Sequence, residues 1–514
     1  DVNLSNKHLN IVPFELEELS QLTKLKLCNN ILTTLPPSIC NLVMITELYL
    51  HNNNINMLPS EIGNMTSLIN LGLMNNNLST LPDEIGNLKK LKHINLKYNK
   101  FIYIPSSLGK LESLEELYLS NNMLIEIHED IGNLSNLLEL HLNSNKLLSI
   151  PSSIGNLQNL KHLLLDNNNL TILPSEIELL SDLETLYLSN NKLSTIPLEM
   201  CKLVNISFLN LVNNKISTIP SEIGNLINLK HLLLGNNIIN MIHHSIGCLD
   251  KLIFLGLSYN SINIIPSSIG NLKKLKQLDI SYNSLTVLPD EIGNLEKITK
   301  LSLHNNLLVT LPSTIGNLNE LNELPVHNNM LISIPNEIGN ITQLSLLDLS
   351  NNVINLLPLE ITNLVNLRYF KYSNNMIENL LHPIINRFIQ RLDNIDNIRN
   401  IYNDGQNIHS SSIQQSIKDS IFRLMQSYDG EYNLTYLDCK YLTNQSKELI
   451  TEYINCNDIH TTLNINFKEL YIAVNIEIDK MECSEKQIQV KQRINEEMND
   501  SMCKCFTGRI TRLV

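Results

Sequence analysis

The amino-acid sequence predicts an α/β solenoid of about seventeen coils, each 23 residues long, with one parallel sheet along its concave side. A short Leu-x-Leu alternation returns every 23 residues between Leu4 and Tyr372, and a fixed period of this length indicates stacked repeats. The chain has 514 residues, too many for one ordinary hydrophobic core, so several domains or a solenoid are required. The strict period favours the solenoid.

Each coil opens with the Leu-x-Leu stretch, of which Leu25 and Leu27 are an example. Alternation of leucine with variable residues is typical of a strand with one buried face. Because the coils stack, we expect their strands to pair in parallel and to form one long sheet.

An asparagine stands three residues after the second leucine in sixteen coils. Where the strand turns inward, backbone groups lose their ladder partners, and an amide side chain supplies both a donor and an acceptor. We therefore expect a structural ladder of Asn30, Asn53, Asn76, Asn99, Asn122, Asn145, Asn168, Asn191, Asn214, Asn237, Asn260, Asn283, Asn306, Asn329, Asn352 and Asn375.

Most coils then carry a proline and an outer segment such as Ser60-Glu61-Ile62-Gly63-Asn64. Proline fixes φ and makes the residue before it extended. We expect a short helix or 3₁₀ turn that is capped by its first Ser or Asp and ended by Gly and Asn. His128 and His243 replace the proline, and we interpret both as plain turn variants.

The frame Leu-Pro-x-x-Ile-Gly-Asn-Leu-x-x-Leu-x-x-Leu-x-Leu-x-x-Asn-x-Leu resembles the Ras-group leucine-rich repeats of the Shoc2 and plant intracellular type, over residues 1–377. The resemblance implies a leucine-rich-repeat horseshoe that acts as an intracellular scaffold. It also implies a protein partner, with a small GTPase or a phosphatase as candidates. The matching residues are the buried ones, so the resemblance is specific for the fold and weak for the partner.

The variable strand positions face the concave side, and there the middle coils become apolar and aromatic. Phe208, Leu233 and Phe254 lie in three successive coils, which is the composition of an interface centre with a polar rim. The alternative, that scattered apolar groups on a sheet face are simply tolerated, stays open. We predict a partner-binding surface that contains Tyr118, His141, His162, Leu164, Tyr187, Phe208, Val212, His231, Leu233 and Phe254.

Charge and motifs argue against several function classes. The net charge of −13 argues against a protein that neutralises nucleic-acid phosphates, and no apolar run is long enough for a membrane span. The nine cysteines are odd in number, and those in the repeats are scattered, which favours a reducing, intracellular compartment such as the cytoplasm. No phosphate loop, kinase, serine-hydrolase or HExxH pattern occurs. We expect a non-enzyme with no cofactor, and we interpret His93, His141, His162 and His231 as sheet-surface residues and not as metal ligands.

Residues 378–514 leave the repeat frame, and we expect a small α+β region there. Residues 383–402, 411–427 and 445–455 have helical spacing, residues 463–478 alternate like strands, and a helix follows from Ser484. The chain ends on Leu513-Val514 soon after a glycine, so we expect that it continues beyond this point.

Three alternatives remain, two of them for the C-terminal region. Cys456-Asn457-Asp458 matches the Cys-x-Asp motif of effector-type ubiquitin ligases, which also carry leucine-rich repeats. Cys483, Cys503 and Cys505 could bind zinc with His460, but the paired Cys-x₂-Cys spacing is missing. Residues 505–509 (Cys-Phe-Thr-Gly-Arg) are similar to segments encoded by giant DNA viruses of the mimivirus group. The third alternative is a structural or virion component whose repeats simply pack together.

Overall fold

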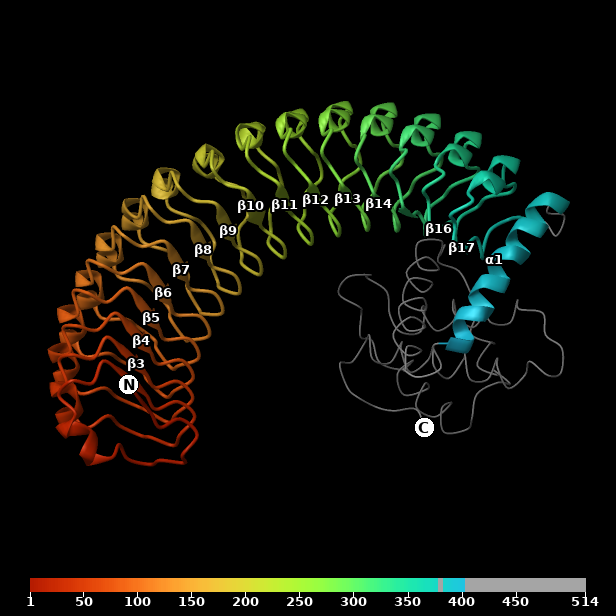
Figure 1. Ribbon diagram of the computed structural model, residues 1–514. Coiled ribbons are helices and arrows are strands. Elements are labelled where there is room, and N and C mark those ends of the chain that lie inside the picture. The colour runs from red at the N-terminus through yellow and green to blue at the C-terminus, as the bar shows by residue number, and fades with distance from the viewer. Residues whose placement is uncertain (378–381, 403–514) are drawn as a thin grey trace, which may run out of the picture. The chain divides into compact units, whose positions relative to one another are not determined.

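The structure, a computed structural model, describes residues 1–377 and 382–402, apart from the side chains of 393–402. The chain divides into two compact units, residues 1–398 and 399–514, and the first is described by itself. Within it, coils stack along a curve with the strands on the inner side and short helical turns on the outer side (Figure 1). The predicted solenoid is confirmed.

Seventeen strands form one parallel sheet in chain order, as the sequence predicted. They are β1 (Val2–Asn3), β2 (Lys24–Lys26), β3 (Glu47–Tyr49), β4 (Asn70–Gly72), β5 (His93–Asn95), β6 (Glu116–Tyr118), β7 (Glu139–His141), β8 (His162–Leu164), β9 (Thr185–Tyr187), β10 (Phe208–Asn210), β11 (His231–Leu233), β12 (Phe254–Gly256), β13 (Gln277–Asp279), β14 (Lys300–Ser302), β15 (Glu323–Pro325), β16 (Leu346–Asp348) and β17 (Tyr369–Lys371).

Neighbouring strands are in register at the repeat length, so Leu25 pairs with Leu48 and Leu48 with Leu71. Side chains in the same repeat position therefore line up in columns across the sheet. At β14 and β15 only Lys300 and Glu323 pair, because Pro325 has no N–H to donate to the ladder.

The outer segments are 3₁₀ turns of five residues each. They span Phe14–Glu18, Pro37–Asn41, Ser60–Asn64, Asp83–Asn87, Ser106–Lys110, Glu129–Asn133, Ser152–Asn156, Ser175–Leu179, Leu198–Lys202, Ser221–Asn225, His244–Cys248, Ser267–Asn271, Asp290–Asn294, Ser313–Asn317, Asn336–Asn340 and Leu359–Asn363.

The predicted Ser or Asp cap is wrong. The cap position is held by the preceding proline, as at Pro59, and Ser60 is already the first residue of the turn and makes no cap bond. Side-chain caps occur where histidine replaces proline: the backbone N–H of Asp130 donates to His128 Nδ1, and that of Ser245 donates to His243 Nδ1. The two histidines thus replace a rigid proline with a hydrogen bond.

The turn glycine allows adjacent coils to approach each other. A Cβ on Gly109 would lie 2.2 Å from the carbonyl oxygen of Asp130 in the next coil. Glu178 and Cys201 replace this glycine, and there the outer turns Ser175–Leu179, Leu198–Lys202 and Ser221–Asn225 lie further apart than in most other coils. A bulky residue at this position therefore separates the outer turns next to β8–β10.

One continuous apolar core fills the coils from Val12 to Leu392. Its C-terminal end is closed by α1 (Pro383–Tyr402), the helix that the sequence predicted. Ile385, Phe388 and Leu392 of α1 are buried, and the Phe388 ring lies 6.5 Å from that of Phe370, edge to face. The helix therefore shields the apolar end of the last coil from water.

No helix among the described residues is long and apolar enough to cross a membrane. The elements predicted beyond residue 402, the Cys456 motif and the cysteines near the C-terminal end lie outside the described residues.

Candidate partner-binding surface

The sixteen repeated asparagines connect each coil to the coil before it. Asn191 is representative: its Oδ1 accepts from the backbone N–H of Leu170 at 3.0 Å, and its Nδ2 donates to the carbonyl oxygens of Leu165 and Leu188 at 3.0 and 3.1 Å. The side chain is 8 % exposed. These buried bonds hold the coil register, and they leave the concave surface to the variable residues.

A second column, which the sequence reasoning missed, lies one residue earlier in each coil. All sixteen of its residues have a left-handed φ of 53–58°; twelve are asparagines, and the exceptions are Tyr98, Ser144, Tyr259 and Tyr282. Asparagine adopts this backbone conformation at little cost, whereas the conformation is rare and strained for a bulky residue such as tyrosine. The side-chain amides of this second column also connect neighbouring coils: Asn75 Nδ2, for example, donates to Asn52 Oδ1 at 3.0 Å. The tyrosines and the serine in a column that is otherwise asparagine were visible in the sequence and could have identified this column.

All ten residues of the predicted partner-binding surface lie on the concave side and are half-buried: Tyr118, His141, His162, Leu164, Tyr187, Phe208, Val212, His231, Leu233 and Phe254. The structure places eight of them in two groups: Tyr118 and His141 form one with their polar neighbours, and the residues from Tyr187 to Phe254 form the other. His162 and Leu164 lie between the two groups, on β8.

The second group contains a continuous row of rings, the aromatic strip, made of Tyr187, Phe208, His231 and Phe254. Tyr187 stacks on Phe208 with ring centroids 4.7 Å apart, and His231 lies 5.6 Å from Phe208 and 6.5 Å from Phe254. Phe208, His231 and Phe254 are direct in-register neighbours on β10, β11 and β12. Burial lowers the pKa of His231, so its ring is neutral at pH 7 and fits an apolar row.

The first group is the paired patch: His93, Glu116, Tyr118, Glu139 and His141 on β5–β7. The Tyr118 hydroxyl lies 2.8 Å from Glu116 Oε2 and 3.0 Å from Glu139 Oε2. His93 Nδ1 lies 2.9 Å from the Glu116 carboxylate, and His141 Nε2 lies 3.3 Å from that of Glu139. Each carboxylate therefore has polar partners within the sheet surface.

The His141–Glu139 contact is a hydrogen bond and not an ion pair at neutral pH. Burial, and then the nearby positive charge of Lys97, lowers the pKa of His141 to about 4, although Glu139 acts in the opposite direction. Burial dominates because only 16 % of the His141 side chain is exposed. Lys97 itself lies over the Tyr118 ring, 4.3 Å from its centroid.

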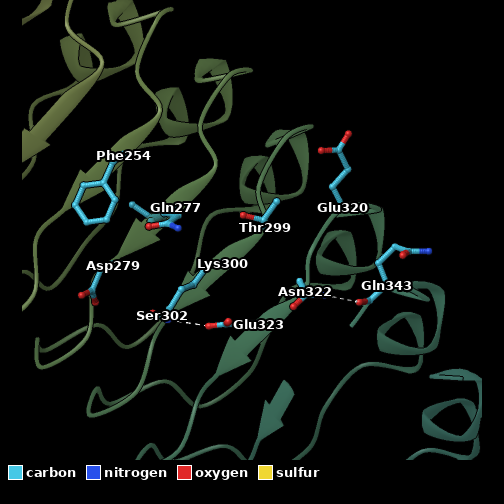
Figure 2. A pocket seen from close by; sticks show the side chains of 11 residues that line it. Phe254, Gln277, Asp279, Thr299, Lys300, Ser302, Glu320, Asn322, Glu323 and Gln343 are labelled. Carbon is cyan, nitrogen blue, oxygen red and sulfur yellow. Dashed lines mark hydrogen bonds and ion pairs between the residues drawn. The ribbon is translucent and has the colours of Figure 1, made fainter. Parts of the chain in front are cut away.

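Two hollows flank Phe254 on the concave face. The larger, about 850 Å³, lies over β12–β15 and has the Phe254 ring at one edge and Gln277 beside it (Figure 2). Lys300 and Glu323 form an ion pair of 2.7 Å across its floor. The smaller, about 500 Å³, has Gly256 in its lining. We call it the Gly256 hollow; its lining includes Val212, Leu233, Gly235, Phe254, Gly256, Tyr259 and Asp279.

A stack of rings, the Tyr–His stack, borders this region: Tyr259, Tyr282, His304 and His327. Tyr259 and Tyr282 lie 4.0 Å apart with planes 10° from parallel, and the two histidines lie 4.6 Å apart. Burial, and then His327, lowers the pKa of His304 to about 4.

The Tyr–His stack interrupts the second asparagine column and leaves Asn305 Nδ2 without an acceptor. In the coils beyond it, Asn328 Nδ2 donates to Asn305 Oδ1 at 2.7 Å. Asn305 Nδ2 would donate to the preceding coil, but Tyr282 stands there, and this buried Nδ2 has no acceptor. An unsatisfied buried amide costs about 1–3 kcal/mol. The Tyr282 ring, which stands in place of the acceptor, therefore lowers the free energy of unfolding.

The described residues offer little for catalysis. Cys28 Sγ lies 3.2 Å from His51 Nδ1, the one described cysteine–histidine contact of this kind, but Cys28 is 4 % exposed and burial raises its thiol pKa. The reactive thiolate is therefore disfavoured. No group of three or more His, Cys, Asp or Glu residues in this part of the chain is arranged to hold a metal ion.

Family models agree with the repeat geometry. Models described as leucine-rich repeat match residues 21–42, 44–65, 66–124 and 158–216. A model described as a leucine-rich repeat region matches the overlapping segments 198–283, 234–345 and 263–429. No catalytic family is among these matches. A search of curated protein sequences gave no match.

Solved structures include similar proteins from bacteria and plants. A leucine-rich-repeat protein of Leptospira interrogans is 34 % identical, with a TM-score of 0.64, over 77 % of this chain and 93 % of its own. The ectodomain of the Arabidopsis thaliana receptor kinase GASSHO1/SCHENGEN3 is 31 % identical, with a TM-score of 0.58, over 73 % of this chain and 50 % of its own. The plant peptide hormone receptor RGFR1 is also 31 % identical, with a TM-score of 0.56, over 73 % of this chain and 70 % of its own.

Repeat spacing, coil-to-coil asparagine bonds, family models and the similarity to the Leptospira protein over most of both chains lead to one assignment: this chain belongs to the leucine-rich-repeat proteins.

Proposed function

We propose that this chain is a non-enzymatic binding module that holds a polypeptide partner on its concave face. The observation that carries the proposal is the aromatic strip. Four rings lie side by side on the sheet surface between residues Tyr187 and Phe254, and the last ring borders two hollows. Aromatic side chains in a partly desolvated centre with a polar rim are typical of binding hot spots.

The neighbouring structures support a polypeptide ligand. GASSHO1/SCHENGEN3 is in complex with CASPARIAN STRIP INTEGRITY FACTOR 2, and RGFR1 is in complex with RGF2. We include Leu164, Val212 and Leu233 in the proposed contact surface, because they are half-buried apolar groups beside the strip. Tyr118, His141 and His162 form its N-terminal rim.

The Ras-group resemblance of the repeat frame extends the proposal. It favours an intracellular scaffold whose partner is a small GTPase or a phosphatase, in signalling or in host interaction. Affinity purification of the chain from its native cell, followed by mass spectrometry, tests this part. Recovery of neither class of protein among specific partners would contradict it.

The contact surface is tested by a triple variant, Phe208→Ala, Leu233→Ala and Phe254→Ala. We expect it to lose at least tenfold in affinity for the partner recovered by that purification, because each residue is an apolar anchor. The matched control is Leu198→Ala, Val204→Ala and Ile227→Ala, which removes three exposed apolar groups from the outer side. Equal affinity of the two folded variants would sink the assignment of the surface.

A further inference from the structure

One strand residue that lines the Gly256 hollow, Gly256 itself, has no side chain. Gly256 pairs in register with Leu233 on one side and Asp279 on the other. The Phe254 ring folds toward the vacant position, so that a Cβ on Gly256 would lie 2.9 Å from Phe254 Cε1. The hollow therefore has an apolar wall, an aromatic wall and a carboxylate wall around a floor of backbone.

Asp279 has no cationic partner in the part of the chain that the structure describes, where no Lys, Arg or His nitrogen lies within ion-pair distance of its carboxylate. Its Oδ1 accepts from the N–H of Ser281 at 3.1 Å and from the Ser281 hydroxyl at 2.6 Å. Both bonds orient the carboxylate without neutralising it, so a negative charge remains at the edge of the hollow.

Asp348 shows what a paired version of the same position looks like. It stands three coils later in the same column, and its Oδ1 makes the same two bonds to Ser350. Its Oδ2, however, lies 3.5 Å from His327 Nδ1. The difference between the two aspartates is the histidine nitrogen close to Asp348, and it is Asp279 that lies beside the hollow.

The aromatic lining is maintained against the local backbone preference. Tyr259, 52 % exposed, lines the hollow and stacks on Tyr282. Both have left-handed backbones in a column that is otherwise mostly asparagine, and Tyr282 deprives Asn305 of its acceptor. A local loss of stability that keeps two rings beside an unneutralised carboxylate is consistent with selection for a ligand.

We propose that the Gly256 hollow receives an arginine side chain of the partner polypeptide. The guanidinium would stack on the Phe254 or Tyr259 ring and form a forked pair with Asp279, while its methylene stem would pack on Leu233 and Val212. A planar guanidinium suits a site with both an aromatic wall and a carboxylate better than a compact ammonium does. This inference rests on the proposed function and names the chemistry that the surface recognises.

The test uses the full chain with ¹³C-labelled valine methyl groups and N-acetyl-arginine methylamide as the probe. The Val212 signal is assigned by its loss in Val212→Ile. We expect the probe to shift the Val212 signal in a saturable manner and N-acetyl-citrulline methylamide, which is uncharged, to leave it in place. The lysine analogue should bind more weakly. Absence of a shift with the arginine probe, or equal shifts with citrulline or lysine, would overturn the proposal.

The matched variants are Asp279→Asn and Asp348→Asn. Asparagine keeps an oxygen that accepts from the following serine in both cases, so neither change disturbs the strand. We expect Asp279→Asn to weaken the arginine probe about tenfold, the effect of losing a hydrogen bond to a charged group, and Asp348→Asn to leave it unchanged. Equal losses in both variants would contradict the site.

The outcome is separable from that of the proposed function. If the probe fails while the triple alanine variant loses its partner, the concave face binds protein and the arginine assignment is wrong. If the probe binds at Val212 while the triple variant keeps its partner, the hollow takes arginine but the contact surface for that partner lies elsewhere.

Discussion

Two regions of the concave face satisfy their polar groups in opposite ways. In the paired patch, the carboxylates of Glu116 and Glu139 contact the Tyr118 hydroxyl and adjacent histidines. Around the Gly256 hollow, the Asp279 carboxylate has no cation and Asn305 Nδ2 has no acceptor.

The difference separates stability from binding. Charges that are paired on one sheet surface contribute mainly to the fold and add little affinity at the rim of the contact surface, since a partner would have to break those pairs. Groups that are oriented but not paired gain their interactions only in a complex. We therefore expect mutations in the paired patch to change the free energy of unfolding, and mutations around the Gly256 hollow to change affinity.

The largest expected effect comes from pH, and it tests whether the histidines of both regions are neutral. Burial lowers the pKa of His141 and of His304 from 6.5 to about 4. Between these values the unfolded chain takes up protons that the folded chain does not, so stability falls as the pH drops from 6.5 to 4 and is retained above 6.5. Each histidine should account for roughly 3 kcal/mol at the acid end.

Urea unfolding at pH 7 and at pH 4.5 measures this dependence. His141→Gln and His304→Gln should each reduce the loss of stability between the two pH values relative to the unmodified chain. If His141 instead formed a true ion pair with Glu139, the His141→Gln variant would become less stable relative to the unmodified chain as the pH falls, and the description of the paired patch would be wrong.

The next prediction compares the loss of one tyrosine hydroxyl in the paired patch with the same loss in the aromatic strip. Tyr118→Phe removes the donor between Glu116 and Glu139, which are in register on adjacent strands, and leaves two like charges facing each other. We expect a loss of about 1–2 kcal/mol in the free energy of unfolding. Tyr187→Phe is the control, because Tyr187 contributes its ring to the aromatic strip; it should change stability by less than about 0.5 kcal/mol. Similar losses in the two variants would remove the distinction.

A smaller effect of opposite sign is expected at the Tyr–His stack. Tyr282→Asn supplies the acceptor that Asn305 Nδ2 lacks and places asparagine in a left-handed backbone, at the expense of the ring contacts with Tyr259 and His304. We expect a net stabilisation of about 1 kcal/mol. Tyr98→Asn relieves the same backbone strain but satisfies no orphaned amide, so it should stabilise the fold less than Tyr282→Asn does. Thermal unfolding compares the two, and a destabilised Tyr282→Asn variant would contradict the argument.

The repeat frame was predictable because every coil has to bury the same positions and satisfy the same backbone groups, and it does so with the same residue types. The alternation at Leu25 and Leu27 predicts the strand, and the period predicts the parallel register. The bonds of Asn191 follow from the orphaned backbone groups at the strand end. The cap at Ser60 failed because the proline before it already occupies the cap position. The serine therefore stands one position after the cap and makes no cap bond.

The site was only partly predictable, since its features depend on pairs of residues 23 positions apart. The sequence places Phe208, Leu233 and Phe254 on the concave face, and the structure has them there. It does not say that the Phe254 ring turns over Gly256, because that depends on a side-chain rotamer. The orphaned amide of Asn305 requires comparison with Tyr282 in the previous coil, within a column that looked like loop residues.

The smallest change in stability, and the sharpest test of the comparison, involves two glycines under aromatic rings. A Cβ on Gly72 would lie 3.0 Å from Tyr49 Cδ1, and one on Gly256 would lie 2.9 Å from Phe254 Cε1. In each case the ring atom can move by a rotation of its side chain, and alanine lowers the conformational entropy of the unfolded chain. Gly72→Ala and Gly256→Ala should therefore each change the free energy of unfolding by less than about 1 kcal/mol.

The two variants should differ in their affinity for the partner. Gly256→Ala fills the hollow and displaces Phe254, so affinity for the partner should fall, whereas Gly72→Ala acts near β4, outside the aromatic strip, and should leave it unchanged. Equal affinity of the two variants, measured by titration calorimetry with the purified partner, would mean that the hollow is an accident of packing and that the contrast between the two regions concerns stability alone.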